Sequence, residues 1–447
     1  MGKDIVIIGA GLVGSLLGIY LAKRGHKVRI YERRGDMRQE AVVAGRSINL
    51  ALSDRGLKAL TEVGIAEEVM KIAIPMPGRF IHNRDGSHAF QPYGKEGQAI
   101  NSVSRGELNK KLMDLAEEHG VEIFFYHHCT AIDWSKNEIN FQAGPELNTV
   151  AFELLFAADG AYSAARLQHM LNHNMFNYQQ FYIDCGYKEI SIPAGPDGKF
   201  LLDKNALHIW PRKDYMLIAL ANQDGSFTGT LFFPFEGETS FSKLDTDVKV
   251  YDFFNREFPD VVKMVPDITR QFFHNPTASL VTVKCFPWIR HDKFTLIGDA
   301  AHAIVPFFGQ GMNCGFEDCS VLNELMDKHG DNWEALLNEF QELRKPDADA
   351  IADLAVNNFI EMRDKVADPK FLLQKKIEAK LHDKYPDKWI PAYSQVTFSP
   401  QIRYSEALRQ GQKQEAIMQE VMKIHGIEEK WKQNELEIEE MILQQIN

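Results

Sequence analysis

The sequence is poor in cysteine, and its few cysteines are widely spaced. The 447 residues include only Cys129, Cys185, Cys285, Cys314 and Cys319, and no CxxC pair occurs. An odd, scattered set of this kind argues against a disulfide framework and against a cysteine-ligated zinc site. The composition therefore fits the reducing cytoplasm.

Basic residues are also fewer than acidic ones. The chain has 50 lysines and arginines against 62 aspartates and glutamates, which gives a net charge of −12 and a pI near 5.7. A general nucleic-acid binder shows a basic surface, so we expect no nucleic-acid partner. A small local basic site for an acidic ligand is still compatible with this balance.

Long apolar runs are missing as well. Residues 5–22 carry no charge and have the length of a membrane span, but four glycines interrupt them, the first at Gly9. Residues 411–447 contain no apolar run long enough to cross a bilayer. We therefore expect no membrane anchor and a cytoplasmic location.

A dinucleotide fingerprint opens the chain. A buried strand is expected over 4–8, followed at once by Gly9, Gly11 and Gly14 and then by a helix over 15–24. The glycines permit the tight turn, the close approach of a pyrophosphate and the contact between helix and strand. This is the structural context in which the motif binds a dinucleotide.

The second strand of this unit, expected over 27–31, ends in Glu32. An acid at this distance accepts hydrogen bonds from the adenosine ribose and favours FAD or NAD over NADP. The chain has no second fingerprint, whereas enzymes with separate FAD and NAD(P) domains usually show two. We therefore expect one bound flavin.

A second glycine loop lies far along the chain. A short strand is expected over 294–297, then a turn at Gly298–Asp299, and a helix from about Asn313 to Lys328. A glycine loop that opens a helix presents free N–H groups, which suit a group that becomes negative. Asp299 would bind the ribityl chain, and the amides near Met312 and Asn313 would bind the pyrimidine oxygen of the flavin.

From about 180 to 290 the pattern changes to β. Strands are expected over 206–211, 215–221 and 227–233, and the last two form an antiparallel pair around a turn. Alternate positions of these strands give a covered and mostly apolar face. The residues on that face are Met216, Ile218, Leu220, Thr230 and Phe232.

After about 330 the chain reads as helical. Pro346 indicates a helix start, and the apolar spacing continues to about residue 365. Asn358 falls within the apolar stripe of that helix. Because a buried amide needs partners, Asn358 is either a core residue bonded to backbone or a ligand contact.

Two histidine patterns in the sequence are candidates for chemical sites. His169 and His173 have the i, i+4 spacing of a metal pair, but no intervening Glu and no nearby third ligand accompany them. We therefore assign no metal. His302 could act beside Asp299, although a structural histidine behind the flavin is the favoured interpretation.

Three motifs together resemble the single-component flavoprotein aromatic hydroxylases, the p-hydroxybenzoate hydroxylase class: the glycine fingerprint with Glu32, Asp159–Gly160, and Gly298–Asp299 with Pro306. Within that class the chain resembles the kynurenine 3-monooxygenase family, and the resemblance runs to about residue 410. Some members continue into a membrane anchor, which is not carried over to this chain. The matching segments are Gly45–Ser53, Gln91–Gly94, Asn205–Pro211, Val305–Asn313, Asn358–Met362 and Val396–Ser399.

The resemblance implies an α/β fold with a Rossmann-like FAD-binding domain of the glutathione-reductase and p-hydroxybenzoate-hydroxylase type. An antiparallel β-sheet substrate domain would be inserted into it, and a C-terminal helical region would complete the substrate pocket. The expected ranges are 1–73, 101–180 and 290–330 for the FAD-binding domain, 74–100 and 181–289 for the sheet domain, and 331–447 for the helical region.

The activity implied is that of an NADPH-dependent flavoprotein monooxygenase. It would convert L-kynurenine to 3-hydroxy-L-kynurenine with FAD, NADPH and O2, through a flavin hydroperoxide, in tryptophan catabolism towards quinolinate and NAD precursors. The aromatic amine already activates the ring, so no protein acid or base is assigned. The alternatives are a related flavin hydroxylase acting on another aromatic acid, and a non-catalytic member of the fold.

The family motifs also imply site residues. Arg79 and Tyr93 would hold the amino-acid carboxylate, and Asn358 and Tyr393 would join the polar end. The ring would be enclosed by Leu207, Met216, Ile218, Leu220, Thr230, Phe232 and Phe307. FAD would contact Gly9, Gly11, Leu12, Val13, Gly14, Glu32, Arg33, Arg34, Ala51, Arg105, Asp159, Asp299, Gly311, Met312 and Asn313.

Two points are left open by the resemblance. Phe308 stands where some family members have histidine, so a polar role at that position is doubtful. The oligomeric state is not fixed by the sequence, and a homodimer is one option.

Overall fold

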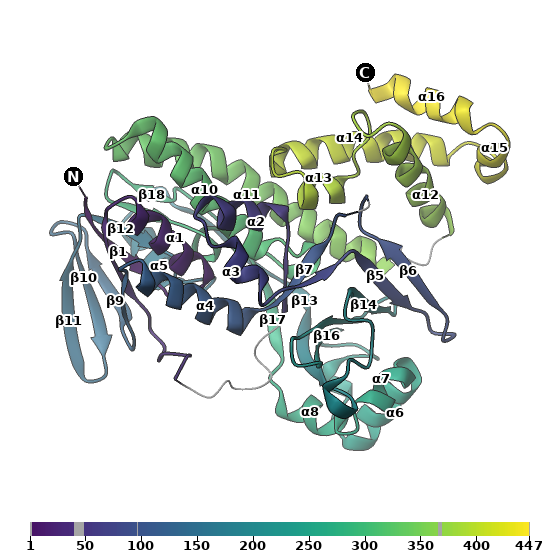
Figure 1. Cartoon of the computed structure of the whole chain (residues 1–447), viewed down its shortest axis with the longest axis horizontal. Coiled ribbons are helices and arrows are strands. Elements are labelled where there is room, and N and C mark those ends of the chain that lie inside the picture. The colour runs from purple at the N-terminus through teal and green to yellow at the C-terminus, as the bar shows by residue number, and fades with distance from the viewer. Residues whose placement is uncertain (1, 40–48, 96, 365–368, 447) are drawn as a thin grey trace.

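A computed structural model describes residues 2–39, 49–95, 97–364 and 369–446. Residues 45–48 of the motif Gly45–Ser53, and the side chain of Met362, lie outside this description. Figure 1 shows an α/β region around the N-terminal strand at the left and a second β region with α6–α8 below it at the lower right. The C-terminal helices lie at the upper right.

The α/β region is built on a six-stranded sheet with the order β18-β19-β12-β1-β2-β8. All neighbours pair in parallel except β18, which is antiparallel to β19. The central strands of such a sheet are covered on both faces, and β12 and β19 are accordingly buried along their whole length. The bounds are β1 (Asp4–Ile8), β2 (Lys27–Tyr31), β8 (Glu122–Phe124), β12 (Leu154–Ala157), β18 (Ile289–Arg290) and β19 (Phe294–Leu296).

Helices cover this sheet and begin close to where the sequence predicts. The first starts at Leu12, directly after Gly11, so Gly14 lies inside it. The helix predicted from Asn313 starts at Gly311. The bounds are α1 (Leu12–Lys23), α2 (Asp54–Glu62), α3 (Ala66–Met70), α4 (Arg105–Glu118), α5 (Ala164–Leu171), α9 (Asp299–His302) and α10 (Gly311–His329).

The second β region is a seven-stranded sheet with the order β17-β13-β16-β15-β14-β5-β6. Its neighbours are antiparallel except β14 and β5, which run in parallel. The bounds are β5 (Gly78–His82), β6 (His88–Pro92), β13 (Asn177–Ile192), β14 (Ala206–Pro211), β15 (Met216–Ala221), β16 (Phe227–Pro234) and β17 (Ala278–Phe286).

The two faces of this sheet have different neighbours. The register pairs Met216 with Phe232 and Ile218 with Thr230, so the alternating face predicted from sequence is confirmed. The opposite face, which includes Trp210, packs against helices from the insertion after β16. These are α6 (Asp247–Glu257), α7 (Pro259–Met264) and α8 (Ile268–His274).

Two small antiparallel sheets complete the β structure. One has the order β3-β7-β4 and the other β11-β10-β9. The division into three regions at 180 and 290 stays a prediction, and the strand β13 crosses the first of these boundaries. The bounds are β3 (Asn49–Leu52), β4 (Ile74–Met76), β7 (Ile100–Ser104), β9 (His128–Asp133), β10 (Glu138–Ala143) and β11 (Glu146–Ala151).

The prediction that a helix starts at Pro346 is wrong. Pro346 lies inside α11 (Trp333–Asp364), a single 32-residue helix. An interior proline costs a helix about 3 kcal/mol because it removes one backbone hydrogen bond. Here the neighbouring Arg344 and Asp347 join buried ion pairs, and Ile351 is fully buried, so tertiary contacts outweigh the local signal.

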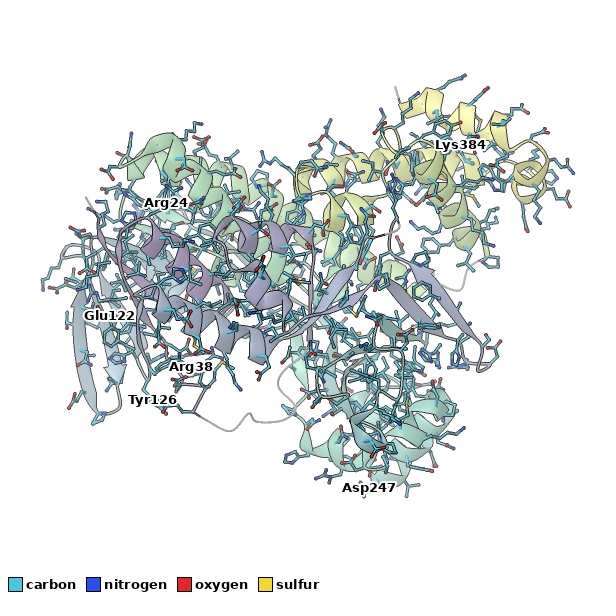
Figure 2. All side chains as sticks on the ribbon, viewed as in Figure 1. Arg24, Arg38, Glu122, Tyr126, Asp247 and Lys384 are labelled. Atoms are coloured by element: carbon cyan, nitrogen blue, oxygen red, sulfur yellow. The ribbon has the colours of Figure 1, made fainter. Side chains whose placement is uncertain are left out.

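Helices α12, α15 and α16 and the later part of α14 form a core of their own, whereas α13 and the start of α14 pack against the cavity region. Ile377, Leu381, Trp389, Met418 and Ile442 are buried in this separate core. Charged side chains cover the outside, and Figure 2 shows Arg24, Asp247 and Lys384 at three separate places on the periphery. The bounds are α12 (Pro369–Lys384), α13 (Ala392–Phe398), α14 (Tyr404–Met422), α15 (Ile427–Gln433) and α16 (Glu435–Ile446).

Within the described ranges, no helix combines the length and the apolar character needed to cross a bilayer.

Candidate active site

A cavity of about 2000 Å³ runs through the middle of the molecule, and all three regions of the chain line it. This exceeds the usual volume of a site for one small ligand. From the predicted cofactor set it is lined by Gly11, Leu12, Val13, Ala51, Arg105, Asp299, Gly311 and Met312. From the predicted substrate set it is lined by Arg79, Tyr93, Leu207, Met216, Ile218, Leu220, Thr230, Phe232, Phe307, Asn358 and Tyr393.

The glycines of the fingerprint have separate structural reasons. Gly9 has φ +102°, and a Cβ there would lie 2.6 Å from the Ala158 carbonyl oxygen. A Cβ on Gly14 would lie 2.0 Å from the carbonyl oxygen of Gly9. A Cβ on Gly11 would meet nothing within 4 Å and would project into the cavity. The space above Gly11 at the start of α1 therefore fits a pyrophosphate.

Gly11→Val gives a direct test of this fit. The residue has φ −76°, and the added carbons point into open space, so we expect a normally folded protein. The same carbons occupy the place proposed for the pyrophosphate. We expect FAD to bind at least about tenfold more weakly. This change corresponds to the binding free energy of about one hydrogen bond or more. Bound flavin absorbance per folded protein measures this, and full retention would contradict the assignment.

Glu32 is held at the end of β2 by the glycine turn itself. Its Oε2 accepts from the Ala10 amide at 3.0 Å, and its Oε1 accepts from the amide and Nε of Arg34 at 3.0 and 2.7 Å. Burial raises the pKa of the Glu32 carboxyl, but these hydrogen bonds outweigh it and leave the pKa below its ordinary value. Glu32 therefore stays ionised, as an acceptor for ribose hydroxyls requires.

The other end of the cavity meets the N-terminus of α10. The first N–H groups of this helix, from Gly311 to Asn313, have no intrahelical acceptor. The side chain of Asn313 is not available to a ligand, because its Nδ2 donates to Ala51 and Gly309 and its Oδ1 accepts from Ser53. Asn313 therefore shapes the loop, and its backbone amide is the group left for the flavin.

Asp299 follows Gly298, which has the positive φ of 59° that the predicted glycine turn requires. It opens the short helix α9 and lines the same cavity as Gly311. One carboxylate and one set of helix N–H groups thus lie along a single wall. This arrangement suits a molecule with hydroxyls at one point and a ring that becomes anionic at another.

Other predicted cofactor residues lie off the cavity wall. The Asp159 carboxylate accepts from the Ser163 hydroxyl at 2.5 Å and the Ala165 amide at 3.1 Å, so it faces the start of α5. Arg33 and Arg34 are exposed on the outer side of Glu32. No side-chain contact in the described residues puts these three groups against the cavity.

The polar end of the substrate half is built around Arg79. Its Nε donates to Gln91 at 2.8 Å, and its terminal nitrogens make no hydrogen bond within the described part of the chain. The rings of Tyr93 and Tyr393 stack with centroids 5.4 Å apart. Burial raises the pKa of Tyr93 well above its ordinary value and that of Tyr393 to about 12, and Arg79 opposes both shifts. Both phenols therefore remain protonated donors.

Asn358 reaches this region from α11. Its Nδ2 donates to the Phe307 carbonyl oxygen at 2.6 Å, and the residue also lines the cavity. Asn358 therefore has the backbone hydrogen bond expected of a core residue, and it also lines the cavity, as expected of a ligand contact.

Aromatic and aliphatic side chains form the opposite wall. Phe307 packs against Phe232 at 4.9 Å and against Phe359 at 4.4 Å between ring centroids. Phe308 stacks on Tyr393 at 5.5 Å, so this position supplies packing to the polar end. A flat aromatic ligand with a charged tail matches this division of the cavity.

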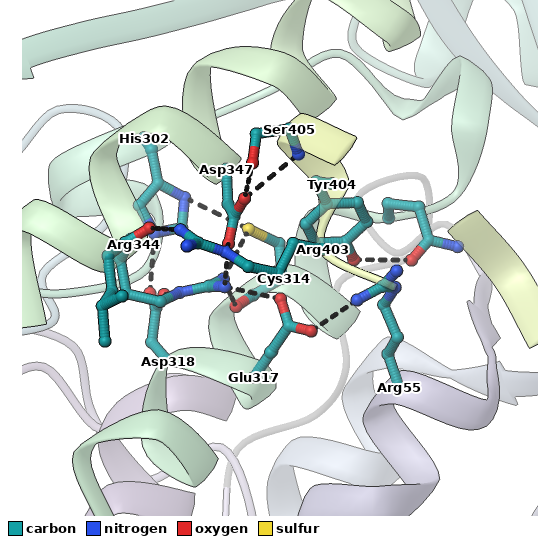
Figure 3. Close-up of polar contacts among 12 residues, drawn as sticks. Arg55, His302, Cys314, Glu317, Asp318, Arg344, Asp347, Arg403, Tyr404 and Ser405 are labelled. Carbon is teal, nitrogen blue, oxygen red and sulfur yellow. Dashed lines mark hydrogen bonds and ion pairs between the residues drawn. The ribbon is translucent and has the colours of Figure 1, made fainter. Parts of the chain in front are cut away.

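Behind α10 lies a buried ionic network that sequence reasoning missed, shown in Figure 3. Arg344 donates to Asp318 at 2.7 Å and to Glu317 at 2.6 Å, and Asp318 also contacts His302 at 2.6 Å. Glu317 bonds Arg55 at 2.5 Å. The partners are far apart in sequence, so spacing gave no signal for them.

The network also reaches the C-terminal helices. Tyr404 donates to the Gln310 side chain at 2.9 Å, and Arg55 lies over the Tyr404 ring at 4.0 Å. Gln310 is the N-cap of α10. The position of the helix N–H groups that face the cavity is therefore tied to α14.

The surroundings of His302 and His169 bear on the two histidine patterns seen in the sequence. Burial opposes charge on His302, but Asp318 and Cys314 outweigh it and raise the His302 pKa well above its ordinary value. This agrees with a structural histidine. His169 is surrounded by Trp134, Phe294 and other rings, and burial lowers its pKa to about 4.

The glycine turn at Gly9–Gly14 and the cavity beside it define a protein that binds a dinucleotide cofactor. A family model described as FAD binding domain matches residues 3–192 and 273–355. Kynurenine 3-monooxygenase of Christiangramia forsetii is 52% identical over 439 residues, 97% of each chain. That of Flavobacterium psychrophilum is 53% identical, covering 100% of this chain and 99% of its own, and that of Dictyostelium discoideum is 44% identical over 95% and 94%. The chain belongs to the kynurenine 3-monooxygenase family.

Solved structures share the fold at much lower identity. 2-Methyl-3-hydroxypyridine-5-carboxylic acid oxygenase has a TM-score of 0.66 at 19% identity, covering 87% of this chain and 98% of its own. A probable FAD-dependent monooxygenase from Pseudomonas aeruginosa has a TM-score of 0.65 at 17% identity, over 81% and 97%. The implied fold class is thereby confirmed.

Proposed function

We propose that the protein hydroxylates L-kynurenine at ring position 3, with FAD as cofactor and NADPH and O2 as co-substrates. One observation carries the proposal. A single cavity holds an unpaired guanidinium end at Arg79, an aromatic wall at Phe232 and Phe307, and the helix N-terminus at Gly311. The names of the family relatives support the same substrate.

In this proposal the fingerprint end and the α10 end hold FAD from both sides. Gly11 and the start of α1 face the pyrophosphate, Glu32 the adenosine ribose, Asp299 the ribityl chain, and the amides near Met312 the pyrimidine oxygen. The bound cofactor, reduced by NADPH, supplies the activated oxygen. The helix N–H groups would donate hydrogen bonds to the adjoining ring and so stabilise negative charge on it without transferring a proton to it.

The substrate's amino-acid end lies at Arg79. A planar guanidinium with two free terminal nitrogens binds a carboxylate through two parallel hydrogen bonds. The neutral phenols of Tyr93 and Tyr393 add donors on the same side. With the tail fixed, the ring falls between Phe307 and the strand residues Met216 and Ile218.

The apolar wall has a second task, which is to keep water from the reacting atoms. Phe232 and Phe307 are buried, and Phe359 packs behind them. A dry site protects a reactive oxygen species from side reactions. We assign no protein acid or base at the ring, because the aromatic amine of the substrate already activates it.

Ligand titration tests the substrate assignment apart from turnover. The FAD-loaded protein is titrated with L-kynurenine, with anthranilate and with 2-aminoacetophenone, and the flavin absorbance is followed. We expect L-kynurenine to bind at least about tenfold tighter than the ketone without the amino-acid tail, since the tail adds charge-assisted bonds worth about 1.5–3 kcal/mol. Equal affinities would favour a related hydroxylase acting on another aromatic compound.

We also infer a cytoplasmic location, which the small number and wide spacing of the cysteines support. The homodimer stays a prediction.

A further inference from the structure

We propose that the outer face of the seven-stranded sheet carries a binding site for a divalent transition metal, formed by His82, His88 and Asp260. His82 and His88 are cross-strand partners on β5 and β6, and Asp260 lies in the first turn of α7. One ligand atom from each lies within 4.8 Å of the other two. The ring centroids of the two histidines are 4.6 Å apart.

This site is separate from the cavity. Arg79 and Ile81 of β5 line the cavity. Side chains alternate between the two faces of a strand, so His82 points to the face covered by α6–α8. His208 and Trp210 of β14 lie on that same outer face and contact the site.

A chain of three contacts runs through the two buried rings. The Asp203 carbonyl oxygen lies 2.8 Å from His208 Nε2. His208 Nδ1 lies 2.9 Å from His82 Nε2, and His82 Nδ1 lies 3.1 Å from Asp260 Oδ2. Both ends of the chain are oxygen acceptors, so every proton in it comes from the two imidazoles.

The proton count leaves one contact unfilled. A neutral imidazole carries one N–H, so two rings supply two protons for three contacts. With His208 donating to Asp203 and His82 donating to His208, the bare His82 Nδ1 faces the Asp260 carboxylate. That oxygen already accepts from Trp210 Nε1 at 2.7 Å. With these tautomers the gap between His82 Nδ1 and Asp260 accommodates a cation, which is either a proton or a metal ion.

The position of His88 favours a metal ion over a proton in this gap. A proton shared by His82 and Asp260 needs no third group. His88 nonetheless stands beside the gap, and its ring nitrogens make no hydrogen bond within the described part of the chain. Two imidazoles and one carboxylate form the ligand set of zinc and neighbouring divalent metals. His208 would orient His82 as the outer partner that metal-bound histidines usually have.

The site is also accessible. The Asp260 side chain is 39% exposed and His88 is exposed, so an ion and a completing water can reach it. The other cluster of similar composition, His302, Cys314 and Asp318, is fully enclosed, and Arg344 already occupies its carboxylate. That cluster is therefore satisfied without an ion.

Residue spacing does not reveal this site, because His88 and Asp260 lie six and 178 positions after His82, on a second strand and on a helix. Bound metal would join the edge of the sheet to α7. We expect its effect on the protein to be stabilisation of that joint.

Calorimetric titration with zinc tests the proposal. The FAD-loaded protein is first treated with a chelator and dialysed, then titrated with Zn²⁺ at neutral pH. We expect one ion per chain with higher affinity than any other zinc uptake. His88→Ala and Asp260→Asn should each weaken this binding at least tenfold. His274→Ala, which removes an exposed histidine of the neighbouring α8, is the matched control and should not change it.

The Asp260→Asn variant and the thermal midpoint distinguish loss of the metal site from loss of the fold. Asp260→Asn retains a side-chain oxygen for Trp210, so it separates loss of the ligand from loss of the fold. Zinc should raise the thermal midpoint of the wild type and not that of either ligand variant. If the wild type takes up no zinc, or if both ligand variants bind it as tightly as the His274→Ala control, the proposal is wrong.

Discussion

Arg79→Met is expected to raise the KM for L-kynurenine about 100-fold. The substitution removes the free terminal nitrogens that face the cavity and keeps a similar apolar stem. Hydrogen bonds to charged groups contribute about 1.5–3 kcal/mol, and about 2.8 kcal/mol corresponds to this change. Steady-state NADPH oxidation against L-kynurenine concentration measures it.

Arg84→Met is the matched control for this experiment. Arg84 also lines the cavity, but it is 64% exposed and its guanidinium is paired with Glu257. We expect its KM to stay within about threefold of the wild type, because the Arg84 guanidinium is mostly exposed and already paired with a protein carboxylate. A normal KM in Arg79→Met would remove Arg79 from the carboxylate site.

Arg344→Met is expected to destabilise the protein by about 3–5 kcal/mol. Breaking a buried pair on one side leaves its partners as uncompensated charges. Here Asp318 and Glu317 would each lose one of two cationic contacts and keep only His302 and Arg55, which leaves an excess of buried negative charge, and Asp318 has no exposed side-chain surface. Because the network supports the N-terminus of α10, we also expect weaker flavin retention. Urea unfolding of the FAD-loaded protein measures the first effect.

Two comparisons isolate the buried charge as the cause. Arg403→Met removes a half-exposed arginine that pairs with Asp347 at the rim of the same network. Its cost should be about 1 kcal/mol or less. Adding Asp318→Asn to Arg344→Met should restore part of the stability, since the orphaned charge is removed. A loss in Arg344→Met no larger than in Arg403→Met would contradict this account.

Local chemistry made much of the fold predictable. The apolar run of β1, the glycines after it and Glu32 form one contiguous unit, and the structure has each element within three residues of its expected bounds. The alternation of Met216 and Ile218 likewise fixed one face of the sheet, because side chains in a strand have a period of two.

Long-range contacts were beyond the reach of the sequence. Pro346 signals a helix start locally, and only the buried partners of Arg344 explain why the helix continues through it. The side-chain direction of Asp159 depends on where α5 begins, which residue type alone does not reveal. The substrate residues are implied by resemblance to a family, since they lie far apart in the sequence, and the structure brings them to one cavity.

The most direct measurement is turnover by the purified, FAD-loaded protein. NADPH oxidation is followed with and without L-kynurenine, and the product is identified by mass and retention time. We expect stimulated oxidation and a product one oxygen heavier that matches authentic 3-hydroxy-L-kynurenine. Oxidation at the same rate with and without L-kynurenine, with no such product, would contradict the proposed function.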